Sequence, residues 1–267
     1  MRVPSLFLLI LLGLFCLAAC GKDDEDKPKP NEPVGKLYND ALDKLEARDY
    51  KESIKGFEEV ERQHPYSEWA VRSEIMVAYA NYRDGKYDAA IGGLDRFVKQ
   101  HPGNRSVAYA FYLKAMCYYE QITDVGRDQK ITGQAQQALN EIVKRFPDSE
   151  YARDARIKLD LVSDHLAGKE MEIGRYYERR QDYLAAINRF RVVVEKYQTT
   201  SHVPEALHRL VECYLKLGVV DQAKRYAAVL GYNYPNSSWY KDSYALMNGE
   251  PLPPEGEKKL WQRVLPF

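Results

Sequence analysis

Apolar residues recur three or four positions apart along most of the chain, and charged residues fill the positions between them. Two segments show the pattern clearly, RDYKESIKGFEEVERQHP (48–65) and GKYDAAIGGLDRFVKQHP (85–102). This period matches one face of an α-helix, whereas the strict alternation of a half-buried strand is weak throughout. The hydrophobic pattern therefore predicts an all-α protein.

Short recurring phrases divide this helical pattern into units. Each phrase closes one helix and supplies a Ser or Asn to cap the next. The phrases are HPYSEWA (64–70), HPGNRSVA (101–108), FPDSEYA (146–152) and YPNSSWY (234–240). A further unit at 180–198 has Gln198 where proline is expected. The units resemble the tetratricopeptide repeat, which implies a solenoid of about five helix-turn-helix units. Small residues at repeat positions 8 and 20 are expected to be buried where helices meet, among them Ala78, Ala90, Ala115 and Ala186.

The spacing of the units predicts where the solenoid is irregular. The closing positions 65, 102, 147, 198 and 235 are separated by 37, 45, 51 and 37 residues. We assign the eight extra residues of the third unit to a loop near 123–133. The longest step predicts an extra connector helix at 148–168. We therefore expect an N-terminal block of three repeats at 36–147 and a C-terminal block of two repeats at 169–248.

The chain begins with a separate apolar segment that ends at a cysteine. Arg2 precedes the apolar run of residues 6–17, which is too short to span a bilayer because spanning takes about 20 residues. The letters LAAC at 17–20 resemble the bacterial lipoprotein box, in which the cysteine is lipidated and becomes the mature N-terminus. We therefore predict a signal peptide at 1–19 and lipidation of Cys20. The alternative is an ordinary signal peptide with an incidental cysteine.

Two proline-containing segments flank the repeats and lack apolar periodicity. Residues 20–35 are predicted to form a flexible tether, because such a composition cannot bury enough surface to offset its ordering entropy. Residues 249–267 are predicted to be disordered alone, with a small amphipathic cluster near the end that could order on a partner.

Neither the composition nor the positions of the histidines and cysteines indicate a catalytic, metal-binding or nucleic-acid-binding site. The 39 basic and 39 acidic residues balance, which argues against a nucleic-acid partner. His64 and His101 each precede a closing proline and are predicted to be structural. Cys117 and Cys213 share a repeat position that keeps them apart, which favours two buried free thiols, although an oxidising compartment permits a disulfide. We expect no metal, no cofactor and no enzymatic activity.

Two longer stretches resemble the BamD family, the lipoproteins of the outer-membrane β-barrel assembly machinery. They are ALDKLEARDYKESIKGFEEVERQHPYSEWA (41–70) and LAGKEMEIGRYYERRQDYLAAINRFRVVVEKYQTTSHVPEAL (166–207). The resemblance implies a non-enzymatic scaffold, held by lipid at the periplasmic face of the outer membrane, that takes part in assembly and insertion of β-barrel proteins. The alternative is another lipid-anchored repeat adaptor, such as a pilotin or a cell-envelope scaffold.

The same resemblance implies three kinds of protein partner. They are the barrel subunit of the machinery through its periplasmic domains, other accessory lipoproteins, and the C-terminal signals of unfolded outer-membrane proteins. Gly21 follows Cys20 where an aspartate would signal retention at the inner membrane, which favours the outer membrane as the address.

In tetratricopeptide repeats the first helix of each hairpin lines the concave face. The register places one set of residues there in the first three units, namely Tyr38, Arg72, Tyr79, Tyr82, Arg83, Tyr109, Tyr112 and Tyr119. We expect this set to form a groove for an extended peptide that ends in an aromatic residue, because tyrosine offers both an apolar ring and a hydroxyl. The alternative is that the tyrosines pack between helices.

The fourth unit has a different character. The register places Met171, Arg175 and Arg179 on its concave face, with Arg180 beside them. The three arginines are predicted to dock the barrel subunit, since the planar guanidinium fork suits carboxylates at an interface. The alternative is an ordinary solvated helix face.

Overall fold

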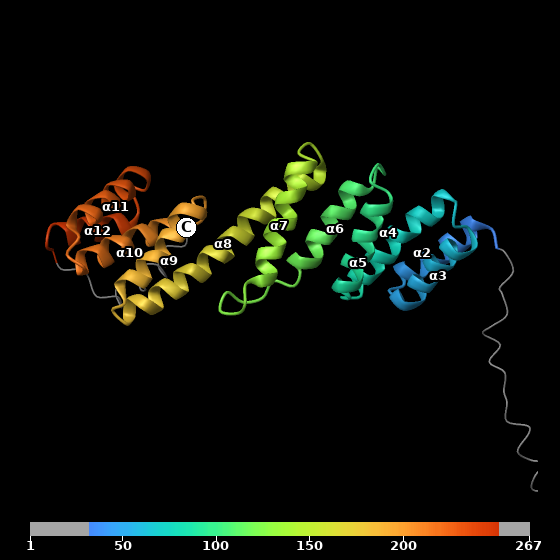
Figure 1. Cartoon of the computed structure of the whole chain (residues 1–267), viewed down its shortest axis with the longest axis horizontal. Helices are drawn as coiled ribbons and strands as arrows, with labels where there is room; N and C mark the ends of the chain where they lie inside the picture. Colours follow the sequence, from blue (N-terminus) through green and yellow to red (C-terminus); the bar gives the residue numbers. More distant parts are fainter. Residues whose placement is uncertain (1–31, 251–267) are drawn as a thin grey trace, which may run out of the picture.

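The computed structural model describes residues 32–250, which form eleven α-helices that follow one another in an elongated stack (Figure 1). Each helix packs chiefly on its neighbours in sequence. The predicted all-α class is confirmed. The predicted signal peptide, Cys20, most of the tether and residues 251–267 lie outside the described residues.

The helices pair into antiparallel hairpins, as the repeat pattern predicts. Their bounds are α2 (Val34–Glu46), α3 (Tyr50–Gln63), α4 (Glu68–Arg83), α5 (Tyr87–Gln100), α6 (Val107–Tyr119), α7 (Lys130–Arg145), α8 (Glu150–Arg179), α9 (Tyr183–Lys196), α10 (Val203–Lys216), α11 (Val220–Asn233) and α12 (Ser238–Met247). Within the described range, no helix is long and apolar enough to cross a bilayer.

Two kinds of turn separate the helices, and each has its own sequence. Between hairpins, Ser67 and Ser149 accept a hydrogen bond from a backbone N–H in the first turn of the next helix. Within four of the hairpins, the chain turns through a residue of positive φ, which is Gly85 (75°) or Gly218 (74°) in two of them. Glycine suits this backbone conformation because it has no Cβ. The short sequences at the turns therefore determine where each helix ends and in which direction the next one runs.

The core is built from small residues where helices cross and large residues between hairpins. Ala78, Ala90, Ala115 and Ala186 are fully or almost fully buried, as predicted from repeat positions 8 and 20. Phe57, Phe97 and Phe190 fill the space between hairpins and are completely buried. The expected insertion in the third unit is also present, since α6 and α7 are joined by residues 120–129 whereas α4 and α5 are joined by 84–86.

Helix α8 differs from the expected connector at one of its ends. It runs without a break for 30 residues, about 45 Å at 1.5 Å per residue, so segment 148–168 continues directly into the first helix of the fourth unit. Gly168 and Gly174 are both buried inside this helix, where they allow close contact and do not end it. A Cβ at Gly168 would come within 3.2 Å of His202, and one at Gly174 would collide with the ring of Phe190.

The hydrophobic core changes partners along α8. Ala152, Ala155 and Val162 pack into a cluster with α6 and α7, whereas Ala167 and Met171 pack into a cluster with α9 and α10. In Figure 1 the helix spans from the middle of the stack to its C-terminal part. The change of core near residue 167 agrees with the division into blocks at 36–147 and 169–248, which stays a prediction.

Candidate functional site

Tyrosines from three helices gather in the N-terminal half of the molecule. Tyr79 and Tyr82 lie three residues apart on α4, and their ring centroids are 6.3 Å apart. Tyr109 and Tyr112 lie three residues apart on α6, and the ring of Tyr151 from α8 lies 5.7 Å from the first and 5.2 Å from the second. All five side chains are half-buried. We call Tyr79, Tyr82, Tyr109, Tyr112, Tyr119 and Tyr151 the tyrosine cluster.

Carboxylates at the edge of the cluster orient its hydroxyl groups. Tyr112 donates a hydrogen bond to Asp154 Oδ2 (2.7 Å), and Tyr82 donates one to Glu120 Oε1 (3.4 Å). Burial and the charge of Glu120 raise the pKa of Tyr82 to about 12. Burial and the bond to Asp154 likewise raise the pKa of Tyr112. At neutral pH both phenols therefore stay protonated and act as hydrogen-bond donors.

Lys158 of α8 connects Tyr119 to the carboxylate of Asp154. Lys158 Nζ lies 2.9 Å from Asp154 Oδ2 and 5.5 Å from the ring centroid of Tyr119. Burial would raise the pKa of Asp154, but the hydrogen bonds from Lys158 and Tyr112 outweigh it and lower that pKa below its usual value. The first turns of α8 thus supply one wall of the tyrosine cluster.

Arg83 lies at the opposite edge, in the last turn of α4. Its Nη1 donates a hydrogen bond to the Tyr79 hydroxyl (2.9 Å), and its guanidinium carbon lies 5.7 Å from the Tyr79 ring centroid. The side chain is exposed. The structure thus brings together six of the eight residues predicted for the groove.

The remaining two predicted residues, Tyr38 and Arg72, belong to a separate aromatic group. The Tyr38 ring packs edge-on against Phe57 (5.2 Å) and Trp69 (4.9 Å), and Arg72 lies over Trp69 (5.4 Å). Within residues 32–250, the ring contacts of Tyr38 are with the buried Phe57 and the half-buried Trp69, and none is with the cluster. Tyr38 therefore fits the alternative of packing between helices.

Three residues of the cluster region were missed by sequence reasoning, Tyr151, Asp154 and Lys158. They fall in the segment that was assigned to a connector. The available signal was the match between HPYSEWA (64–70) and FPDSEYA (146–152), which aligns Tyr151 with the aromatic residue Trp69 after a capping serine.

The predicted docking residues lie at the C-terminal end of α8 but do not form one free surface. Met171 is completely buried among Phe190, Leu207 and their neighbours, so its expected place on the concave face is wrong. Arg175 Nη1 is paired with Glu205 Oε1 of α10 (2.9 Å). Arg180 donates to the Tyr176 hydroxyl (2.9 Å) and lies over that ring, and Arg179 is exposed.

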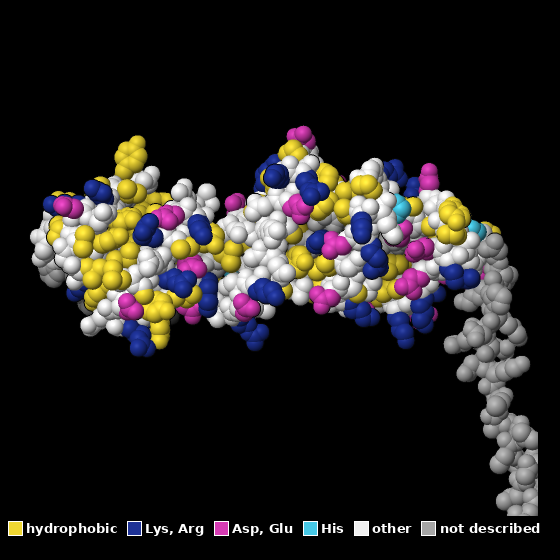
Figure 2. Space-filling model, in the orientation of Figure 1, with side chains coloured by type: hydrophobic (Ala, Val, Ile, Leu, Met, Phe, Trp, Pro, Cys, Tyr) yellow, Lys and Arg dark blue, Asp and Glu magenta, His cyan; other side chains and the backbone are white. Residues whose placement is uncertain are grey.

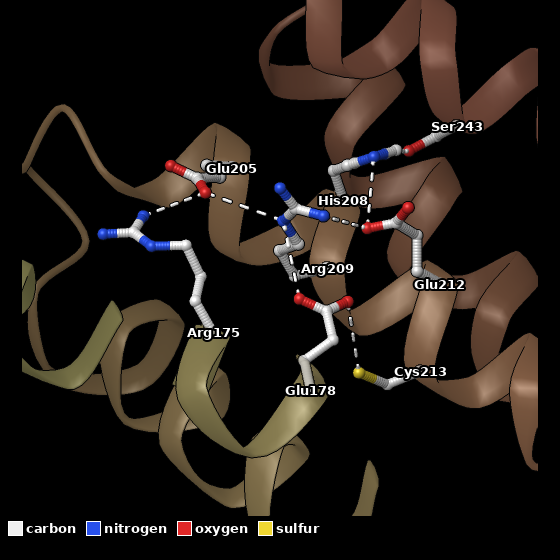
Figure 3. A network of polar contacts seen from close by, with 8 residues as sticks. All are labelled: Arg175, Glu178, Glu205, His208, Arg209, Glu212, Cys213 and Ser243. Atoms are coloured by element: carbon white, nitrogen blue, oxygen red, sulfur yellow. Dashed lines mark hydrogen bonds and ion pairs between the residues drawn. The ribbon is translucent and has the colours of Figure 1, made fainter. Parts of the chain in front are cut away.

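A polar network ties α8 to α10 and α12 close to these arginines (Figure 3). Arg209 is shared by three carboxylates, with Nη1 at 2.8 Å from Glu212, and Nε at 3.6 Å from Glu205 and 3.7 Å from Glu178. His208 Nδ1 lies 2.8 Å from the Ser243 hydroxyl of α12. Burial raises the pKa of Glu178 to about 7, because its distant contact with Arg209 offsets only part of the desolvation cost.

The described residues hold no group of three or more His, Cys, Asp and Glu side chains placed to bind a metal ion. Cys117 and Cys213 are buried free thiols, as favoured from the sequence. Burial raises the pKa of the Cys117 thiol to about 12, which makes it a poor nucleophile. His64 and His101 are the C-cap residues of α3 and α5, which is the structural role predicted for them.

Comparison with known proteins shows close relatives. A family model described as YfiO, outer membrane lipoprotein, matches residues 30–230. The outer membrane protein assembly factor BamD of Caulobacter vibrioides is 55% identical over 240 residues, which cover 87% of this chain and 79% of the relative. The factor of the same name from Rickettsia prowazekii is 44% identical over 239 residues, 90% of this chain and 94% of the relative. Among solved structures, the TPR2AB domain of yeast Sti1 in its pHSP90 complex covers 80% of this chain and 83% of its own, with a TM-score of 0.42 and 15% identity.

Proposed function

The chain belongs to the YfiO family of outer membrane lipoproteins, and we propose that it is a non-enzymatic assembly factor for outer-membrane β-barrel proteins. The observation that carries this proposal is the 55% identity to an outer membrane protein assembly factor over most of both chains. The alternative of a pilotin or another repeat adaptor loses its support, because the family model matches residues 30–230.

Within that function, we propose that the tyrosine cluster receives the aromatic C-terminal signal of an unfolded barrel protein. Its half-buried rings offer apolar surface, and the hydroxyls of Tyr82 and Tyr112 are held by carboxylates in fixed orientations. A fixed ring loses little conformational entropy when a ligand packs on it, which suits the reversible binding of an extended peptide.

The end of α8 is our proposed docking site for the periplasmic domains of the barrel subunit. Arg179 and Arg180 are exposed there, whereas Arg175 is engaged with Glu205 and acts as a support for the helix. Guanidinium groups on a fixed helix end suit carboxylates of a partner. Other accessory lipoproteins are further partners of such an assembly, and the lipid on Cys20 is the proposed link to the membrane.

The receptor role is tested by measuring the affinity of a labelled peptide that ends in phenylalanine for the wild type and for Tyr79→Ala, Tyr112→Ala and the double variant. We expect each single substitution to weaken binding about tenfold, since one aromatic contact is worth about 1–1.5 kcal/mol. Tyr244→Ala is the matched control, because Tyr244 is exposed on α12.

Circular dichroism and melting must show that the double variant is folded. If the tyrosines only pack the repeats, any loss of affinity will follow the loss of folded protein. Unchanged affinity in a folded double variant would contradict the receptor role and leave the protein as a scaffold.

A further inference from the structure

Arg83 is held by the phenol of Tyr79 instead of by a carboxylate. Its Nη1 donates to the Tyr79 hydroxyl at 2.9 Å, and its guanidinium lies over the ring of the same residue. These contacts with Tyr79, and to a smaller degree the nearby phenol of Tyr50 on α3, raise the pKa of Arg83. The guanidinium is thus held over Tyr79, at the edge of the tyrosine cluster.

This position leaves the charge of Arg83 without a counter-ion in the part of the chain that the structure describes. The groups that act on it electrostatically are the two tyrosines, and it forms no ion pair with an acidic residue there. Arg180 has the same arrangement with Tyr176 at the end of α8, whereas two other arginines in the last turns of helices are ion-paired. Arg62 pairs with Glu59 at 2.6 Å and Arg145 pairs with Glu141 at 2.8 Å. A guanidinium has five N–H donors, so Arg83 retains donors in a fork that matches a carboxylate.

The surroundings of Arg83 tell which carboxylate would fit. Tyr79 links Arg83 to the tyrosine cluster, since its ring is 6.3 Å from that of Tyr82 and its phenol acts electrostatically on Tyr109. The carboxylates of Glu120 and Asp154 lie beyond those rings, bonded to Tyr82 and Tyr112. A ligand carboxylate is therefore attracted to Arg83 and repelled by Glu120 at the other edge, where Lys158 balances the charge of Asp154.

We propose that Arg83 is the subsite for the free α-carboxylate of a peptide whose last side chain is aromatic. The carboxylate pairs with the guanidinium, and the terminal ring then packs on the tyrosines next to it. This inference rests on the proposed function, because it assigns one end of the peptide within the same cluster. Arg83 thereby sets the direction of the bound peptide and selects a chain end over an internal segment.

The test compares one phenylalanine-ended peptide as the free acid and as the carboxamide. Its affinity is measured by fluorescence anisotropy for full-length lipidated protein in detergent, in the wild-type form and as Arg83→Gln. The control is Arg145→Gln, because Arg145 also stacks on a ring at a helix end (4.8 Å from Phe111) but is already ion-paired. Melting of each variant confirms the fold.

We expect the carboxamide to bind wild type and Arg145→Gln about tenfold more weakly than the acid, since one charge-assisted hydrogen bond is lost. In Arg83→Gln the two peptides should bind alike, with the affinity that the carboxamide has for the wild type. Equal binding of acid and amide to the wild type would overturn the proposal, as would a tenfold preference that persists in Arg83→Gln. Binding of neither peptide would instead show that the proposed receptor function has failed, and the inference with it.

Discussion

At the scale of single residues, the short turn inside four of the hairpins keeps one backbone shape whatever residue occupies it. Gly85 and Gly218 have φ near 75°, and Arg48 and Gln181, at the same repeat position, have φ values of 62° and 63°. A non-glycine residue in this region costs about 1–2 kcal/mol. The packing of the helices on either side therefore outweighs the local preference of Arg48 and Gln181.

The buried carboxyl group of Glu178 is only partly compensated by a nearby cation. Its carboxylate is largely buried, and Arg209, the nearest cation in the network, makes its shortest contact with Glu212 instead. Burial therefore raises the pKa of Glu178 to about 7, above the value of about 4.3 that glutamate has in an unfolded chain.

At a pH between the unfolded and the folded pKa of Glu178, the folded protein binds more protons than the unfolded chain. The contribution of Glu178 to the free energy of unfolding therefore decreases as the pH rises from about 5 to about 8. Glu178→Gln removes the proton linkage and keeps an acceptor for the Cys213 thiol. We measure the free energy of unfolding of both proteins in urea. The difference, variant minus wild type, should increase by about 1–2 kcal/mol as the pH is raised from 5.5 to 8. Glu195→Gln, on the exposed side of α9, serves as control. A stability difference that does not change with pH would contradict this account.

The site residues could be predicted where the repeat register fixes the side of the helix. Tyr79, Tyr82, Tyr109 and Tyr112 come together because positions three apart share one helix face. Tyr38 does not join them, since its ring packs between Phe57 of α3 and Trp69 of α4. Contacts between elements of different hairpins, such as Tyr112 with Asp154, depend on how α8 lies and could not be read from spacing.

At the scale of elements, α8 carries the largest difference between expectation and structure. The 51-residue step predicts extra helical residues correctly, but they extend an existing helix and do not form a separate one. Gly168 and Gly174 look like helix-weakening residues in the sequence. A Cβ at Gly174 would collide with the ring of Phe190, so glycine is required there, whereas a Cβ at Gly168 would only crowd the His202 side chain at 3.2 Å. Tertiary packing outweighs the local preference.

The end of α8 offers a test of the docking proposal that leaves its internal ion pair intact. Arg179→Glu with Arg180→Glu should weaken binding to the purified periplasmic domains of the barrel subunit by about tenfold. Each reversal also places a negative charge at a helix C-terminus, which costs about 0.3–1 kcal/mol, so the helix should remain folded.

The matched control for this pair is Lys224→Glu with Arg225→Glu, two exposed cations on α11. Calorimetry on both double variants measures the affinity, and circular dichroism confirms the fold. Wild-type affinity in the α8 variant would remove Arg179 and Arg180 from the interface. Equal losses in both variants would show only a general effect of charge.

At the scale of the whole molecule, the repeats separate two surfaces and α8 connects them. The tyrosine cluster lies on α4, α6 and the first turns of α8, whereas the polar network joins the last turns of α8 to α10 and α12 in the C-terminal half (Figures 1 and 3). The face shown in Figure 2 carries charges of both signs along its length, and hydrophobic side chains gather over the C-terminal repeats. Because α8 packs in both the N-terminal and the C-terminal half, it suits a scaffold that holds a substrate near a partner.

We predict that lipidation of Cys20 attaches the protein to the membrane. Cys20→Ser removes the thiol that carries the acyl chains, each buried methylene of which is worth about 0.8 kcal/mol of membrane affinity. We expect the variant to lack acyl mass and to leave the membrane fraction. Fractionation and intact-mass spectrometry measure both properties. Wild-type mature protein without acyl mass at residue 20 would contradict lipidation.

We place this repeat lipoprotein in the machinery that assembles β-barrel proteins. To test this placement, the tagged full-length protein is purified from detergent-solubilised membranes and the proteins that accompany it are quantified, with an unrelated tagged outer-membrane lipoprotein as control. We predict that the barrel subunit of the machinery co-purifies in near-stoichiometric amount with this protein and not with the control. Its absence from the preparation, with the protein folded and membrane-bound, would contradict the account.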